Sequence, residues 1–164
     1  MKKVICFSLL ALSLLSGCWP EKEPRDKGIK QQLYLLDVNT KEVYNDCHIP
    51  GAMHVSFDEI EDFAKDLDKN ADLVVYCSNY RCTTSGMVVK KLKQMGFKNV
   101  KAYEAGIAEW HQQERPTQGA CSMGFLTMKV TPPKEHDSDI EIISTDELAQ
   151  LIEKYKKEGG IAKW

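Results

Sequence analysis

Residues 73–96 read LVVYCSNYRCTTSGMVVKKLKQMG, and this stretch decides the fold. Its first part, Leu73 to Tyr76, is a continuous apolar run of the kind that predicts a strand buried on both faces. A polar loop starts at Cys77 and leads to a helix expected from Ser85 to Met95, which Gly96 is placed to end. A strand, a loop and a helix in this order are typical of α/β proteins.

Units of the same kind lie on both sides of this stretch. Short apolar runs predict strands at Leu33 to Leu36 and at Val100 to Tyr103, and a helix from Gly106 through Trp110 follows the second run. Ser56 and Glu59 form a capping box, which predicts the start of another helix. The alternation predicts an α/β fold with a central parallel sheet flanked by helices, a three-layer sandwich, over residues 32–116.

The pattern weakens after Pro116 and returns near the end of the chain. Residues 117–139 are expected to be an irregular segment and linker, with one candidate strand from Phe125 to Val130. Residues 140–164 combine a strand-like run with an amphipathic helix behind a capping box.

The first residues predict export. Met1 to Lys3 is basic, and the apolar run Val4 to Leu15 is too short to span about 30 Å of hydrocarbon as a helix, so residues 1–17 are expected to be a signal peptide. Its end, LSGC at residues 15–18, resembles the lipobox of bacterial lipoproteins. That resemblance implies lipidation of Cys18 and a membrane anchor in the bacterial cell envelope, on the periplasmic side. An ordinary signal with a chance cysteine is the alternative, and residues 18–31 are expected to be a flexible tether.

Composition excludes some partners. The 164 residues include 22 basic and 24 acidic ones, a net charge of −2, and a mildly acidic chain is not expected to bind nucleic acid. Export also permits disulfides among the four cysteines that remain beyond Cys18, which are Cys47, Cys77, Cys82 and Cys121. The sequence leaves every pairing open.

Cys77 is the candidate nucleophile. Loop amides and the N-terminus of the following helix direct partial positive charge at its sulfur, and Arg81 adds a full charge. We therefore expect a lowered pKa and a solvent-open thiolate at Cys77, beside amides that could hold a sulfur anion. The alternative is a buried structural cysteine at the end of a strand.

Five pieces in order carry a family resemblance: Asp37-Val38, residues 48–52 (HIPGA), residues 74–77 (VVYC), residues 96–100 (GFKNV), and Gly106-Ile107 through Trp110. Over about residues 33–116 the chain resembles the rhodanese homology domain. The resemblance implies that Cys77 accepts sulfur from a donor such as thiosulfate or a persulfide, and passes it to cyanide or a thiol. It also implies a substrate-binding loop around Cys77, formed by Ser78, Asn79, Tyr80, Arg81, Cys82, Thr83 and Thr84.

No cofactor is expected, and His48 and His54 do not match a zinc pattern, so no metal is expected either. The chain departs from the family at its loop, which is longer and lacks the usual glycine. Thr83 stands where related phosphatases carry an arginine, which argues against hydrolysis of phosphate esters. Asn39, Cys47 and Ala105 replace the family's usual arginine, glycine and glycine.

Cys82 leaves several functions open. It could resolve a persulfide on Cys77 into a disulfide, cycle with Cys77 as a dithiol redox pair, or simply pack at the helix start. The function classes are therefore an exported, lipid-anchored sulfurtransferase, a thiol–disulfide protein, and a non-catalytic binding module on the same loop.

The strand and helix that usually open the family are missing before Leu33, and residues 142–148 (IISTDEL) look like that unit. Either this C-terminal strand and helix complete the sheet, or they begin a second domain that is truncated. The apolar face of the helix needs to be covered, which favours the first arrangement.

Overall fold

The computed structural model describes residues 32–162. The expected signal peptide, the lipidation site Cys18 and the tether all lie outside these residues. Within the described part of the chain, no helix is both long and apolar enough to cross a membrane.

A parallel sheet of 5 strands forms the centre of the molecule, in the order β2-β1-β3-β4-β5. The strands are β1 (Leu33–Asp37), β2 (Met53–His54), β3 (Asp72–Tyr76), β4 (Asn99–Tyr103) and β5 (Glu141–Ile142). The helices are α1 (Lys41–Asp46), α2 (Ile60–Ala64), α3 (Thr84–Gln94), α4 (Gly106–Gln112) and α5 (Thr145–Glu158), with 3-10 turns η1 (Phe57–Glu59) and η2 (Gly124–Thr127).

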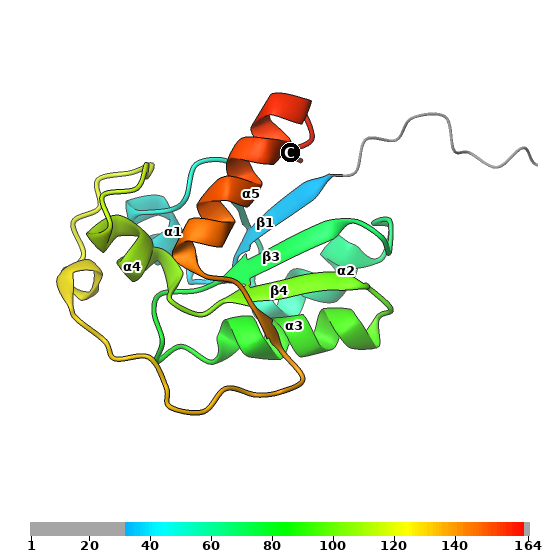
Figure 1. Ribbon diagram of the computed structural model, residues 1–164, viewed down its shortest axis with the longest axis horizontal. Coiled ribbons are helices and arrows are strands. Elements are labelled where there is room, and N and C mark those ends of the chain that lie inside the picture. Colours follow the sequence, from blue (N-terminus) through cyan, green and yellow to red (C-terminus); the bar gives the residue numbers. More distant parts are fainter. Residues whose placement is uncertain (1–31, 163–164) are drawn as a thin grey trace, which may run out of the picture.

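Helices cover both faces of the sheet, which confirms the predicted three-layer α/β fold (Figure 1). Helices α2 and α3 pack on one face, against Leu73 and Val75 of β3. Helices α4 and α5 pack on the other, against Val74 and Tyr76. Because successive side chains of a strand point to opposite faces, a strand covered on both sides must be apolar throughout, as residues 73–76 are.

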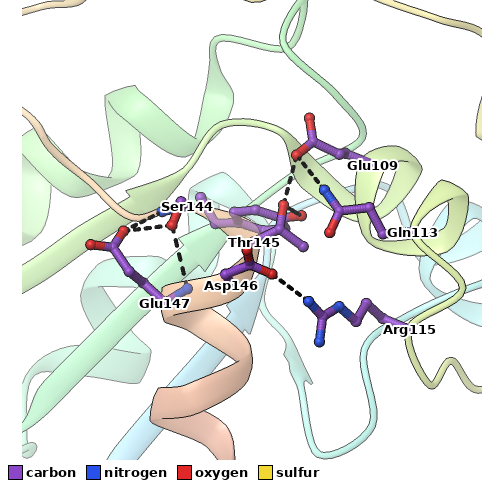
Figure 2. Close-up of polar contacts among 8 residues, drawn as sticks. Glu109, Gln113, Arg115, Ser144, Thr145, Asp146 and Glu147 are labelled. Carbon is purple, nitrogen blue, oxygen red and sulfur yellow. Dashed lines mark hydrogen bonds and ion pairs between the residues drawn. The ribbon is translucent and has the colours of Figure 1, made fainter.

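The C-terminal strand and helix complete this sheet. Strand β5 pairs in parallel with β4, where Ala102 lies opposite Ile142. Helix α5 starts at a capping box around Ser144 and buries Leu148, Ile152 and Tyr155 against the second face (Figure 2 shows the start of the helix). After α5 the chain returns to β1, where the Leu33 amide donates to the Gly160 carbonyl at 2.8 Å and Ile161 forms a bridge with Leu33. The predicted arrangement in which the C-terminal strand and helix complete the sheet is therefore confirmed.

The predicted strand from Phe125 to Val130 is wrong. Residues Gly124–Thr127 form the turn η2, and Leu126 is its buried side chain. The Gln112 side-chain amide donates to the carbonyls of Leu126 and Met128, at 2.8 and 3.1 Å, so this segment is held by a helix rather than by a strand partner. Helix α1 and strand β2 were not predicted, because neither has a long apolar pattern.

One disulfide resolves the open cysteine pairing. Cys47 and Cys121 are bonded, with a Cα–Cα distance of 4.6 Å and a sequence separation of 74. The bond fastens the irregular segment to the end of α1, where Asp46 also accepts hydrogen bonds from the amides of Ser122 and Met123. Cys77 and Cys82 are left as free thiols.

Candidate active site

The cysteine loop leaves the sheet at the carboxyl end of β3, next to the N-terminus of α4. The Ile107 amide donates to the Cys77 carbonyl and the Ala108 amide to the Ser78 carbonyl, both at 3.0 Å. This close approach requires Gly106, whose φ is +66° and where an added Cβ would lie 2.5 Å from the Cys77 carbonyl oxygen. Helix α4 therefore fixes the start of the loop through its first amides.

Local hydrogen bonds turn the loop back on itself. The Asn79 side chain accepts from the Arg81 amide at 3.0 Å, and the Asn79 carbonyl accepts from the Cys82 amide at 2.9 Å. Such turns are a common role of asparagine, whose side chain bonds to the backbone two residues on. As a result Cys82 returns to the side of Cys77, just before α3 begins at Thr84.

The Cys77 side chain is fully buried, with 0% of its surface exposed. Its sulfur lies 3.3 Å from the Cys82 carbonyl oxygen and 3.5 Å from the hydroxyl of Ser85, which is itself buried. Val75 and Val88 belong to the same apolar cluster. The Cys82 side chain is only half-buried.

The pKa values of the two thiols are shifted in opposite directions. A hydrogen bond with the Cys77 side chain lowers the pKa of Cys82, and burial opposes this shift. Hydrogen bonds from the Thr84 hydroxyl and from the amides of Thr84 and Ser78 lower this pKa further. The same sulfur–sulfur hydrogen bond raises the pKa of Cys77, and burial and the nearby charge on Cys82 raise it further. The thiolate of the pair is therefore held on Cys82.

The expectation of a solvent-open thiolate at Cys77 is thus wrong, because this side chain points into the core beneath the start of α3. The expected role of Arg81 is also not found: its side chain is exposed and, among the described residues, contributes to neither thiol's pKa. The expected amides are present, since Thr84 donates to one sulfur and Ser85 to the other. That Cys77 carries the sulfur stays a prediction.

The remaining loop residues have structural positions. Tyr80 donates to Glu109 of α4, whereas Thr83 is exposed at the N-cap of α3 without a side-chain capping bond. The residue that sequence reasoning missed is Ser85, expected only as a helix start. A hydroxyl in the first turn of a helix that follows a reactive cysteine was the available signal.

A cavity of about 330 Å³ lies beside the loop. Its lining combines loop, helix and linker residues: Tyr80, Cys82, Thr83, Ser85, Gly86, Met87, Lys90, Glu104, Pro133, Asp137 and Ile140. The linker is fastened over it by an ion pair between Lys90 and Asp137, and by a contact of 3.0 Å between His136 and Glu104. The charge of Lys90 is therefore paired with a carboxylate.

A polar network connects the loop to the C-terminal helix. Glu109 accepts from the Tyr80 hydroxyl at 2.9 Å and from the Thr145 hydroxyl at 2.7 Å. Thr145 in turn lies 2.8 Å from the hydroxyl of Tyr103, and Arg115 pairs with Asp146 at the same helix start (Figure 2). The first turn of α5 thereby supports the loop through one carboxylate.

Comparison with known proteins agrees with this geometry. Residues 22–113 match the family model described as Rhodanese-like domain. A protein named thiosulfate sulfurtransferase GlpE, from Coxiella burnetii, is 30% identical over 91 residues, which cover 56% of this chain and 82% of that protein. The putative sulfur carrier protein YrkF of Bacillus subtilis is 34% identical over 80 residues, but the match spans only 42% of its length and 49% of this chain.

Solved structures give the same picture. The BH2092 protein from Bacillus halodurans has a TM-score of 0.50 at 31% identity, over 54% of this chain and 65% of that one. The Rhodanese-like domain of the Alr3790 protein from Anabaena has a TM-score of 0.50 at 29% identity, over 66% and 84%.

Proposed function

Because the chain belongs to the rhodanese-like domain family, we propose that it is a sulfurtransferase in which Cys77 holds sulfane sulfur as a persulfide. One observation carries the proposal: Cys77 directly follows β3, the strand in the middle of the sheet, and its sulfur receives hydrogen bonds from the first turn of α3. The relative named as a thiosulfate sulfurtransferase, from Coxiella burnetii, supports the same chemistry.

The geometry fits covalent catalysis in two half-reactions. In the first, a cysteine thiolate attacks the outer sulfur of the donor. The bond between this sulfur and the rest of the donor breaks, and the rest of the donor leaves with the electron pair. In the second, a thiol or cyanide attacks the outer sulfur of the persulfide and regenerates the cysteine. The amide and hydroxyl of Ser85 donate hydrogen bonds to the Cys77 sulfur, and the same donors are placed to stabilise the anionic form of its persulfide.

Mass spectrometry of the full chain after treatment with thiosulfate or cysteine persulfide tests the proposal. The wild-type chain should gain one sulfur atom on the peptide that contains Cys77 and lose it on addition of cyanide. Cys77→Ala should abolish turnover, whereas Lys98→Ala, an exposed change away from the loop, should keep it. Turnover that survives Cys77→Ala contradicts the proposal.

A second candidate is a thiol–disulfide protein in which Cys77 and Cys82 cycle. Two observations favour it: both thiols are free, and the Cys77 sulfur lies 3.3 Å from the Cys82 carbonyl oxygen, whereas a disulfide needs the two residues side by side. Equilibration with reduced and oxidised glutathione separates the candidates. A redox protein loses two hydrogens from the Cys77–Cys82 pair and gains no sulfur from a persulfide donor, whereas a sulfurtransferase gains sulfur.

We further propose that the chain is exported and lipid-anchored through Cys18. The sequence of residues 1–18 motivates the proposal, and the Cys47–Cys121 disulfide supports it because such bonds persist in oxidising compartments. Phase partition in a cloud-point detergent provides the test. The wild-type chain should enter the detergent phase and the Cys18→Ala chain the aqueous phase, and equal partition of both contradicts the anchor.

A further inference from the structure

The cavity beside the loop meets Cys82 and not Cys77. Cys82 and Ser85 belong to its lining, whereas Cys77 lies behind them without exposed surface. A donor that occupies the cavity therefore encounters Cys82 before Cys77. The Cys77 sulfur is covered by the two groups it contacts, the Cys82 backbone and the Ser85 hydroxyl.

We propose that Cys82 is the entry nucleophile, which takes sulfane sulfur from the donor and passes it to Cys77. The proposal rests on the sulfurtransferase function proposed above and adds a second catalytic residue to it. The pair of free thiols then works as a relay, with an accessible sulfur at the cavity and a protected sulfur behind it.

Both steps of the relay conserve atoms, protons and electrons. The Cys82 thiolate attacks the outer sulfur of a persulfide R–S–SH, the S–S bond of the donor breaks, and the thiol R–SH leaves while Cys82 keeps an anionic persulfide. Cys77 then attacks the outer sulfur of that persulfide, the bond to Cys82 breaks, and the Cys77 proton passes to the Cys82 sulfur. The sulfane sulfur keeps its oxidation state, so no oxidant or reductant is needed.

The hydrogen bonds at the two sulfurs suit this direction of transfer. Before the first step, Thr84 and the Ser78 amide hold Cys82 as the thiolate, the form that attacks. In the second step the same donors stabilise Cys82 as the leaving group. The Cys77 sulfur already lies 3.3 Å from the Cys82 carbonyl oxygen, so the proton has a short way to pass between the two residues.

The charges in the cavity indicate the class of donor. Lys90 is matched by Asp137, and Glu104 adds a further carboxylate, so the lining has no excess of positive charge for a dianion such as thiosulfate. Apart from Cys82, the other lining side chains are uncharged, and Met87 and Ile140 among them are apolar. A persulfide of a small thiol suits such a cavity better.

Time-resolved loading of the full chain in mild detergent tests the relay. Limiting cysteine persulfide is added without oxygen, the thiols are trapped by alkylation, and the sulfur on each cysteine peptide is measured by mass. We expect sulfur on Cys82 before Cys77 in the wild type, and sulfur that stays on Cys82 in Cys77→Ala. Loading of Cys77 in Cys82→Ala should slow by about a factor of ten or more, and thiosulfate should load the wild type more slowly than the persulfide.

The outcomes separate the relay from the proposed function. Cys77 loaded at the wild-type rate in Cys82→Ala overturns the relay and leaves the sulfurtransferase standing. A wild-type chain that gains no sulfur on either cysteine overturns both. If Cys82→Ala does not fold, the order of labelling in the wild type decides, because sulfur on Cys77 first overturns the relay. Equal loading by thiosulfate at low ionic strength overturns the donor class.

Discussion

Removal of the Cys47–Cys121 disulfide should destabilise the fold by about 4 kcal/mol. The bond closes a loop with a sequence separation of 74, and the chain-entropy model gives about 4.4 kcal/mol at 25 °C for a loop of that length. The Cys47 side chain is fully buried, so loss of its sulfur also leaves a small void that costs roughly 1 kcal/mol more. Such a loss is a large part of the usual stability of one domain, about 5–15 kcal/mol.

Urea unfolding of the Cys47→Ala/Cys121→Ala double variant measures this loss, in a Cys82→Ser background that prevents a second disulfide. With a slope of about 2 kcal/mol per molar urea, the midpoint should fall by about 2.5–3 M, since the opened loop and the void together cost about 5 kcal/mol. Ser122→Ala is the matched control, because it removes a hydrogen bond of 2.7 Å to Asp46 at the same contact but keeps the loop closed. Its cost should be about 0.5–1 kcal/mol.

Reduction of the background protein opens the same loop but keeps both sulfur atoms, so it should cost about 1 kcal/mol less than the double variant. A double variant that unfolds within about 1 kcal/mol of the background would refute the reasoning, since the denatured chain would then gain little freedom from the opened loop.

Further changes test the loop and its support. Gly106→Ala should lower the unfolding free energy by more than about 2 kcal/mol, because the added Cβ would meet the Cys77 carbonyl at a residue with a positive φ. Gly124→Ala is the control and should be nearly neutral, because a Cβ added there meets no other atom. Equal effects of the two changes on thermal or urea unfolding would contradict the close approach at Gly106. Thr145→Val removes the hydroxyl that joins the buried Tyr103 to Glu109, and it should lower the unfolding free energy by about 1–3 kcal/mol. An unchanged urea midpoint would be evidence against this hydrogen-bond network. Because the pKa of Cys82 is lowered, iodoacetamide should alkylate Cys82 at a lower pH than it alkylates an ordinary thiol. Cys77→Ala should move the midpoint of the plot of alkylation rate against pH to higher pH. A midpoint that does not move would show that the hydrogen bond from Cys77 is not the cause of the lowered pKa.

Local signals in the sequence were sufficient for the framework of the fold. The run at residues 73–76 is apolar at every position, and only a strand covered on both faces explains that. The capping box at Ser144 and the glycine at 159 place the two ends of α5 because cap geometry involves only neighbours in the chain. The family pieces placed Cys77 at the end of a strand in the same way.

The environment of the thiols could not be predicted from local signals. Which cysteines pair depends on how α1 and the irregular segment meet across a separation of 74. Whether Cys77 faces solvent depends on how the loop turns and on what α3 covers. The Cys82 sulfur takes the negative charge because Thr84 and Ser78 donate to it, contacts that exist only once the loop has closed.

The position of α5 has a consequence for the order in which the molecule can assemble. The segment that covers the second face of the sheet, and the residues that pair with Leu33, are translated after strands β1 to β4 and helices α1 to α4. A nascent chain that lacks them leaves apolar side chains of β3 and α4 uncovered, so this face of the sheet closes only after α5 has been made.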